Sequence, residues 1–323
     1  MTQFIGIDMS KDSFVVFYPQ SKQSATFKNT SVGVAHFIAT LSTQDHCVLE
    51  ATGTYSYLLT YSLCQQQKKV SVVSPLAVKR FAQAQLKTIK NDKTDARLLA
   101  SFGEVFQPAL YRMPDESLRR LKQQRTALRV LKKQQTQLKG VLHSFEFIPD
   151  ADKVALKALQ KALQVIDKQV ETLQAQLSTH IEQDYQKNLE LVCSIKGIGE
   201  ETAKQIIIAT NGFKNFTSAR AFAKFIGIVP TQCQSGSSVN KGSRMSKSGD
   251  PQLRGMLYTC SWSAMRFNSQ CKQLYNRLRA KGKSGKLALG AVMNKLLKQV
   301  FAVVQSGVKY QENYKSVRTS AQN

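Results

Sequence analysis

Four carboxylates in the first hundred residues have types and spacing that could support chemistry. Asp8 and Glu50 each end an apolar run, while Asp92 and Asp95 stand three residues apart at the start of an expected helix. Carboxylate oxygens suit Mg²⁺ or Mn²⁺, and two such ions about 4 Å apart can activate an attacking oxygen and stabilise a leaving one. Each acid alone would more often be a capping or solvated residue. Together, in a segment with only six acidic residues, they favour a metal site for phosphodiester chemistry.

A glycine-rich turn is the second chemical feature. Gly197 and Gly199 follow Lys196 between two expected helices, in the stretch 194–203. The pattern matches a helix-hairpin-helix, whose backbone amides can face a phosphate and bind DNA without reading its sequence. A purely structural turn is the alternative. We treat Lys196, Gly197 and Gly199 as candidate nucleic-acid contacts.

A serine-rich basic stretch, residues 234–249, places hydroxyls beside Lys241, Arg244 and Lys247. Such a stretch suits phosphate binding or a serine nucleophile, but no histidine base lies nearby in the sequence. Chemistry alone does not choose among its six serines, and a flexible basic loop is the simpler interpretation.

Two further basic or aromatic features are weaker. The segment KGKSGK lacks the spacing of a nucleotide-binding phosphate loop, so we interpret it as a basic turn in which Lys283 and Lys286 contact a nucleic-acid backbone. Trp262 could stack on a base, but core packing is the better expectation.

The elements that must position the carboxylates predict an α/β domain. Strands are expected at 3–8, 13–19, 24–29, 46–50 and 70–73, with helices at about 32–41 and 55–67 and helical segments reaching about 106. The order β-β-β-α-β-α-β-α is that of the ribonuclease H-like fold. Its first and fourth strands are neighbours, so Asp8 and Glu50 would end side by side. The helix that begins at Asp92 could then come against them.

The rest of the chain is expected to be mainly helical. Residues 115–145 and 152–185 predict an antiparallel helical hairpin, although a helix pair inside a globular domain fits the periodicity equally well. Short helices are expected at 190–230, a loop at 231–252, helix at 253–305, and a loose polar tail after Tyr310. The hairpin prediction depends on a heptad seam formed by Leu159, Leu163, Ile166, Val170, Leu173 and Leu177.

Charge and composition indicate the class of partner. The chain has 323 residues, 42% of them hydrophobic, and a net charge of +25 that usually means a polyanionic partner. Residues 231–323 contain 16 basic and two acidic residues and are the strongest candidate for binding nucleic acid. Six cysteines without a CxxC pair argue against a zinc site or disulfide framework and fit a reducing cytosol. No stretch reaches the ~18 apolar residues of a membrane span, so a soluble, cytoplasmic protein without a membrane partner is expected.

Five blocks of this sequence resemble a known family. IGID, LEATGTY, NDKTDARLLA, IKGIGEETA and SGSSVNKGSRMSKSGD occur in that order, and a closing KLALGAVMNKL extends the likeness to nearly the whole chain. They are similar to the DEDD-type insertion-sequence transposases, which are bridge-RNA-guided serine recombinases, with the Piv-type DNA invertases as relatives.

The resemblance implies an architecture and a set of site residues. A RuvC-like ribonuclease H-fold domain (1–110) would be followed by a coiled-coil helical hairpin (111–187), a helical transposase domain with the helix-hairpin-helix and serine loop (188–310), and a polar tail (311–323). The metal tetrad would be Asp8, Glu50, Asp92 and Asp95, and the nucleophile Ser235. In the family the tetrad of one protomer works with the serine of another, inside a homodimer or homotetramer.

The function expected on this basis is Mg²⁺-dependent DNA recombination, with Mn²⁺ as a substitute. The chain would join donor and target double-stranded DNA, guided by a bridge-type non-coding RNA, in the bacterial cytoplasm at the nucleoid. Three alternatives stay open: a Piv-type invertase, a RuvC-like nuclease without a covalent intermediate, and a non-enzymatic nucleic-acid-binding protein.

Overall fold

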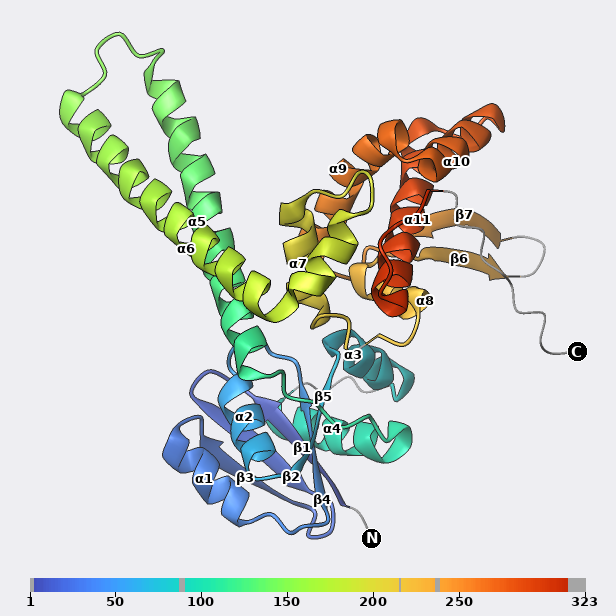
Figure 1. Ribbon diagram of the computed structural model, residues 1–323. Coiled ribbons are helices and arrows are strands. Elements are labelled where there is room, and N and C mark those ends of the chain that lie inside the picture. The colour runs from blue at the N-terminus through green and yellow to red at the C-terminus, as the bar shows by residue number, and fades with distance from the viewer. Residues whose placement is uncertain (1–2, 87–90, 215, 236–238, 313–323) are drawn as a thin grey trace, which may run out of the picture. The chain divides into compact units, whose positions relative to one another are not determined.

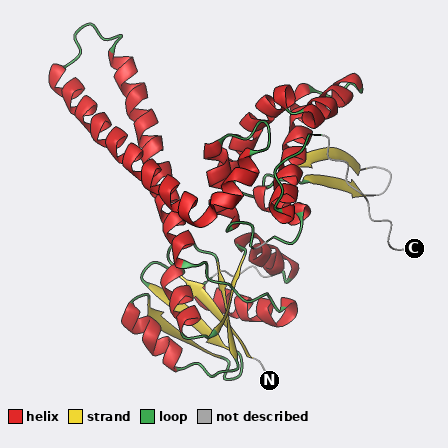
Figure 2. Cartoon of the chain, in the orientation of Figure 1, coloured by secondary structure: helices red, strands yellow, loops and turns green. Residues whose placement is uncertain are grey.

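The chain forms two compact units, Met1–Met113 and Pro114–Asn323. The computed structural model describes residues 3–86, 91–214, 216–235 and 239–312, and side chains within these ranges except for 232–244. The first unit mixes strands and helices, and the second is mainly helical (Figure 2). The predicted division into three domains and a tail stays a prediction.

A five-stranded sheet organises the first unit. Its strands are β1 (Gln3–Met9), β2 (Ser13–Tyr18), β3 (Gln23–Lys28), β4 (Asp45–Glu50) and β5 (Lys69–Val73), arranged in the order β3-β2-β1-β4-β5 (Figure 1). The pairs β1–β2 and β2–β3 are antiparallel, whereas β4 runs parallel to β1 and β5 parallel to β4. The predicted element order and the predicted adjacency of the first and fourth strands are confirmed.

Helices cover both faces of this sheet, which is why β1, β2 and β4 are almost continuously apolar. Helices α1 (Ser31–Ala39) and α2 (Tyr57–Gln65) pack on one face, where Phe14 and Val16 of β2 are buried against them. Helices α3 (Pro75–Ala84) and α4 (Asp92–Phe106) pack on the other face. There α4 covers Val15 and Phe17, the alternate residues of β2.

A long helical hairpin begins the second unit. Helix α5 (Glu116–Phe145) and helix α6 (Lys153–Cys193) lie side by side and antiparallel (Figure 1). Asp115 and Asp152 cap their first turns by accepting hydrogen bonds from backbone amides. Along the predicted seam only Val170 and Leu177 are fully buried, and α6 continues beyond 185 after a break in helical geometry at Tyr185. The helical hairpin is present, while its description as a coiled coil stays a prediction.

The remaining helices enclose a second core. They are α7 (Glu200–Thr210), α8 (Ala219–Ile226), α9 (Pro251–Phe267), α10 (Ser269–Ala280) and α11 (Gly285–Ser306). Helix α11 is long and apolar enough to cross a membrane, a feature that the sequence-based exclusion overlooked because lysines interrupt its apolar run. Its residues Val292, Leu296, Leu297 and Val300 are fully buried in this core, as in the core helix of a globular protein.

Two expectations about the second unit were wrong. The segment expected as a loop contains β6 (Pro230–Ser235) and β7 (Val239–Met245), an antiparallel pair. Its polar composition hides the strands because backbone hydrogen bonds, rather than an alternating apolar face, define them. Trp262 was expected in the core, yet its side chain is 45% exposed on α9. The tail was expected to be loose, and this stays a prediction: Glu312 accepts a hydrogen bond from the backbone amide of Ser269, but residues 313–323 lie outside the described residues.

Candidate active site

Asp8 and Glu50 lie at the same edge of the sheet. Asp8 is the next-to-last residue of β1, and Glu50 is the last residue of β4. Because β1 and β4 are parallel neighbours, with Ile7 opposite Leu49, their carboxyl ends meet there. Both side chains are half-buried. The predicted pairing of these two carboxylates is confirmed.

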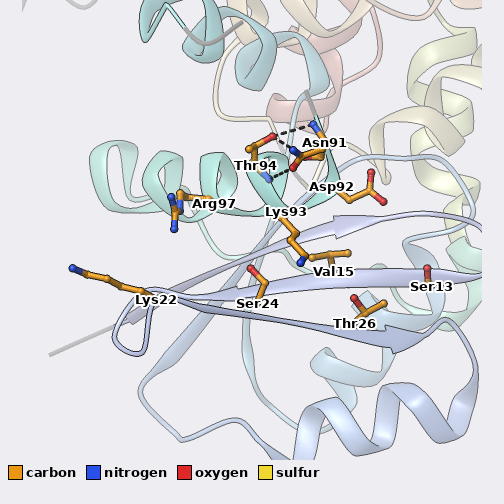
Figure 3. A pocket seen from close by; sticks show the side chains of 10 residues that line it. All are labelled: Ser13, Val15, Lys22, Ser24, Thr26, Asn91, Asp92, Lys93, Thr94 and Arg97. Atoms are coloured by element: carbon orange, nitrogen blue, oxygen red, sulfur yellow. Dashed lines mark hydrogen bonds between the residues drawn. The ribbon is translucent and has the colours of Figure 1, made fainter. Parts of the chain in front are cut away.

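The first turn of α4 supplies the other two carboxylates. Asn91 caps the helix by accepting a hydrogen bond from the Thr94 amide at 2.8 Å, and the Thr94 hydroxyl accepts one from the Asn91 amide at 3.0 Å (Figure 3). This reciprocal capping box fixes where the helix begins. Asp92 is exposed and Asp95 half-buried in that first turn, where the helix dipole favours negative charge.

A glycine lets α4 lie directly on β1. A Cβ at Gly6 would be 1.9 Å from the carbonyl oxygen of Ala96 and 2.4 Å from the amide nitrogen of Ala100. Both distances are far below any tolerated contact, so only glycine permits this approach. Since Gly6 lies two residues before Asp8 and Ala96 follows Asp95, this contact sets how close the helix carboxylates come to the strand carboxylate.

The electrostatics at Asp8 show that the other three carboxylates act on it. The pKa of Asp8 is raised to about 6, first by burial and then by the negative charges of Asp95, Asp92 and Glu50. A hydrogen bond from the Met9 amide opposes the shift. The four predicted residues are therefore brought into one electrostatic site.

This donor set fits a hard divalent cation. All four candidate ligands are carboxylates, and the repulsion felt at Asp8 is what a bound cation would relieve. Within the described residues, no group of three or more His, Cys, Asp or Glu side chains is close enough together to hold an ion as it stands. A bound ion would therefore need the carboxylates to lie closer together than they do in this structure.

Asn29 is a site residue that the sequence analysis missed. Its Nδ2 donates to the carbonyl oxygens of Ser10 and Lys11 after β1, and to that of Tyr55 after β4. It therefore ties together the two loops that follow the carboxylate-bearing strands. No sequence signal distinguishes it, since Asn29 also fits an ordinary position just before the cap of α1.

Ser235, the predicted nucleophile, is the last residue of β6 and pairs with Val239 of β7. Its side chain, like those of Lys241 and Arg244, is outside the described set, as are residues 236–238. The base of this strand pair is described. The Arg254 guanidinium donates to the carbonyl oxygens of Ile226 and Lys247 there.

The predicted nucleic-acid contacts have different surroundings. Lys196 is half-exposed and forms an ion pair with Glu312 at 2.9 Å. Gly197 has a φ of +106° and packs against Ala264 of α9, whereas the space beside Gly199 is open. This packing gives Gly197 the structural role that the sequence left as an alternative.

The other predicted contacts lie at turns. Lys247 adopts a φ of 55° just after β7, and its amide bonds to the Gly227 carbonyl. Lys283 and Lys286 are exposed on either side of the start of α11.

Two transposase family models match this chain. The DEDD transposase model of the IS110 type matches residues 5–145, and the model described as Transposase IS116/IS110/IS902 family matches residues 189–276. The first contains all four carboxylates, and the second contains the glycine turn and the β6–β7 strands. The chain belongs to the IS110-type transposase family.

Some relatives of this IS110-type enzyme are named as gene-inverting proteins and others as insertion-element proteins. The pilin gene-inverting proteins of Moraxella bovis and Moraxella lacunata are each 28% identical to it over 94% of this chain and 95% of their own length. An uncharacterized 43.6 kDa protein of insertion element IS110 from Streptomyces coelicolor is 24% identical over 49% of this chain and 38% of its own. The chain is thus a DNA recombinase or transposase.

Proposed function

We propose that this IS110-type enzyme cuts and rejoins DNA through a Mg²⁺-dependent carboxylate site and a serine nucleophile. The observation that carries the proposal is the nearness of the four carboxylates: Asp8 and Glu50 lie at the ends of neighbouring parallel strands, and the charges of Asp95, Asp92 and Glu50 add to burial in raising the pKa of Asp8. A bound Mg²⁺ or Mn²⁺ would supply Lewis-acid polarisation of the scissile phosphate. Asp8, Glu50, Asp92 and Asp95 would hold the ion, and α4 would keep the last two in place.

Ser235 is proposed as the group that attacks the phosphate. Its Oγ forms a new P–O bond, the Oγ proton is released, and the P–O bond to the departing sugar oxygen breaks as that oxygen takes up a proton. The resulting phosphoserine ester conserves the bond energy until a sugar hydroxyl of the partner DNA reverses the attack. The place of Ser235 at the end of β6, within the segment 189–276 that the transposase family model matches, supports this role.

Trapping a covalent adduct tests this proposal against a RuvC-like nuclease that uses water. Wild-type protein with its own flanking DNA and Mg²⁺ should yield a denaturation-resistant protein–DNA adduct. Ser235→Ala should yield none while still binding DNA, and Asp8→Asn should reduce adduct formation more than about 100-fold, beyond the usual cost of losing an outer-shell partner. Normal recombination by Ser235→Ala would remove Ser235 from the mechanism.

Guidance by a bridge-type non-coding RNA is proposed for the choice of donor and target DNA. The large excess of positive charge supports a second polyanion beside DNA. The enzyme should be purified from cells that carry its native flanking DNA, and its bound nucleic acid sequenced. A discrete RNA with loops matching both DNA partners is expected, and its absence would contradict guidance.

Site-specific inversion is a second candidate, favoured by one observation. The relatives that match nearly the full length are named for inverting a pilin gene, whereas the insertion-element relative matches half the chain. Inversion of flanking DNA by enzyme free of RNA would favour this alternative over transposition. In either case the enzyme would work as a homodimer or homotetramer on cytoplasmic DNA.

A further inference from the structure

An open groove of about 780 Å³ runs along the first unit beside the carboxylate site. One wall is the start of α4, with Asp92, Lys93 and Arg97. The floor is the adjoining face of β2 and β3 (Figure 3). Asp92 therefore belongs both to the groove and to the carboxylate tetrad.

The groove exists because α4 covers only part of its sheet face. Helix α4 buries Val15 and Phe17 of β2, and β3 lies one strand further out. Ser24 pairs with Phe17 and Thr26 with Val15, so these hydroxyl side chains share the face that α4 covers. Both side chains are exposed and form a polar floor. Apolar side chains at these positions would need a helix to cover them.

Three cations surround this floor. Lys22 stands at the β2–β3 turn, while Lys93 extends from the helix toward the sheet face that carries Val15 (Figure 3). The Arg97 guanidinium lies 4.9 Å from the centre of the Phe17 ring, which holds it over the sheet. None of the three cations forms an ion pair with any residue that the structure describes.

Basic side chains beside exposed hydroxyl groups are well suited to bind a sugar–phosphate backbone. Lysine and arginine neutralise phosphates, and serine and threonine hydroxyls bond to phosphate oxygens without reading bases. Because Asp92 lines the same groove, a strand held there would pass directly to the carboxylates. A strand at the carboxylates is the one being cut, which in a transposase is DNA.

We propose that this groove binds the backbone of the DNA strand that enters the carboxylate site, with Lys22, Lys93 and Arg97 as its phosphate contacts. The assignment rests on the proposed function of that site. It also adds a DNA-binding surface to the first unit, whereas the strongest sequence signal was in residues 231–323.

The test compares two full-length double variants that lose the same charge. Lys22→Asn/Lys93→Gln removes two groove cations, with asparagine chosen because Lys22 has a φ of 55°. The matched control Lys69→Gln/Lys79→Gln removes two exposed lysines of the same unit that lie outside the groove. Affinity for a short DNA with a single-stranded segment is measured against salt concentration, in EDTA so that no chemistry occurs.

The groove variant should lower the slope of log affinity against log salt by about 1.4–1.8, the value for two lost phosphate contacts. The control should leave the slope unchanged. Equal slopes for wild type and the groove variant, or an equal loss in the control, would overturn the proposal.

Photo-crosslinking gives a second readout that does not depend on charge. A benzophenone amino acid at Ser24 should crosslink to the DNA, whereas one at His36, on α1 across the sheet, should not. Because neither experiment needs strand transfer, failure of the groove can be told apart from failure of the carboxylate site, which Asp8→Asn tests by activity.

Discussion

At the scale of single residues, the raised pKa of Asp8 means that its ionised form is unfavourable in the folded chain without a cation. The unfolded chain titrates Asp8 near the ordinary pKa of 3.8, whereas the folded, metal-free chain does so at about 6. Between these values the folded state binds the proton more tightly, so the free energy of unfolding contributed by Asp8 falls as pH rises from about 4 to about 6. At neutral pH the ionised Asp8 side chain thus destabilises the folded chain, and a bound cation would offset this cost.

Thermal unfolding in EDTA tests this pH dependence. Asp8→Asn should be more stable than wild type above pH 6, by about 1–2 kcal/mol after allowing for the solvent that reaches this half-buried group. The difference should vanish near pH 4. Equal stability of the two proteins at pH 7.5 would show that neither burial nor the neighbouring carboxylates raises the pKa of Asp8.

Metal addition should stabilise the wild type selectively. Mg²⁺ or Mn²⁺ should raise the melting temperature of the wild type and have little effect on Asp8→Asn, because a ligand that binds only the folded state stabilises it. Glu104→Gln, on the exposed side of the same α4 helix, should respond like the wild type. An equal metal response in all three proteins would contradict a cation at the tetrad.

These carboxylates could be predicted from the sequence because each stands at an end of a recognisable element. Asp8 and Glu50 lie at or next to the last residue of apolar strands, and Asp92 follows a capping asparagine. The groove could not be predicted, because Lys22, Lys93 and Arg97 meet only through the packing of α4 on β2. Trp262 was misplaced because aromatic character alone does not reveal which side of α9 faces the core.

At the scale of elements, the position of α4 decides whether the site forms. Gly6→Ala would place a methyl group against the Ala96 carbonyl and push the helix away from β1. We expect lower stability and a loss of strand cleavage of at least about tenfold, since ångström-scale misplacement of reacting groups is costly.

The matched control for this substitution is Gly140→Ala, in α5. No atom lies within 4 Å of a Cβ there, so alanine should stabilise the helix by about 0.5–1 kcal/mol and leave cleavage intact. Cleavage and melting temperature measured together distinguish the two. Wild-type cleavage by Gly6→Ala would show that the helix position is not limiting.

The turn between α6 and α7 offers a similar comparison. Gly197→Ala combines a φ of +106° with a contact of 2.6 Å to the Ala264 Cβ, so it should lower the melting temperature. Gly199→Ala meets open space at an ordinary φ of −85° and should fold normally. If the turn binds phosphate, Gly199→Ala should weaken DNA binding without loss of stability. Unchanged DNA affinity would leave the turn purely structural.

Elements were predictable where apolar periodicity defines them and were missed where it does not. The sheet of the first unit and the helices of the second follow from such patterns. Strands β6 and β7 were missed because polar residues and glycines dominate residues 231–245. Those strands carry Ser235, so the least predictable element is the one on which the proposed nucleophile depends.

At the scale of the whole molecule, the proposed chemistry divides between the two units. The tetrad belongs to Met1–Met113 and Ser235 to Pro114–Asn323. The sequence alone does not distinguish a tetrad that acts with the serine of the same protomer from one that acts with the serine of a partner. Only the resemblance to DEDD-type transposases favours a composite site between protomers.

Mixing two inactive variants tests that composite site. Asp8→Asn keeps its serine and Ser235→Ala keeps its tetrad, so each should be inactive alone. If the site joins two protomers, a mixed dimer contains one complete site, and a random equal mixture should regain roughly a quarter of the wild-type sites. Adduct formation after co-refolding or co-expression provides the measurement. A mixture that remains inactive, although mass spectrometry shows mixed oligomers, would place the tetrad and serine of one reaction in the same protomer.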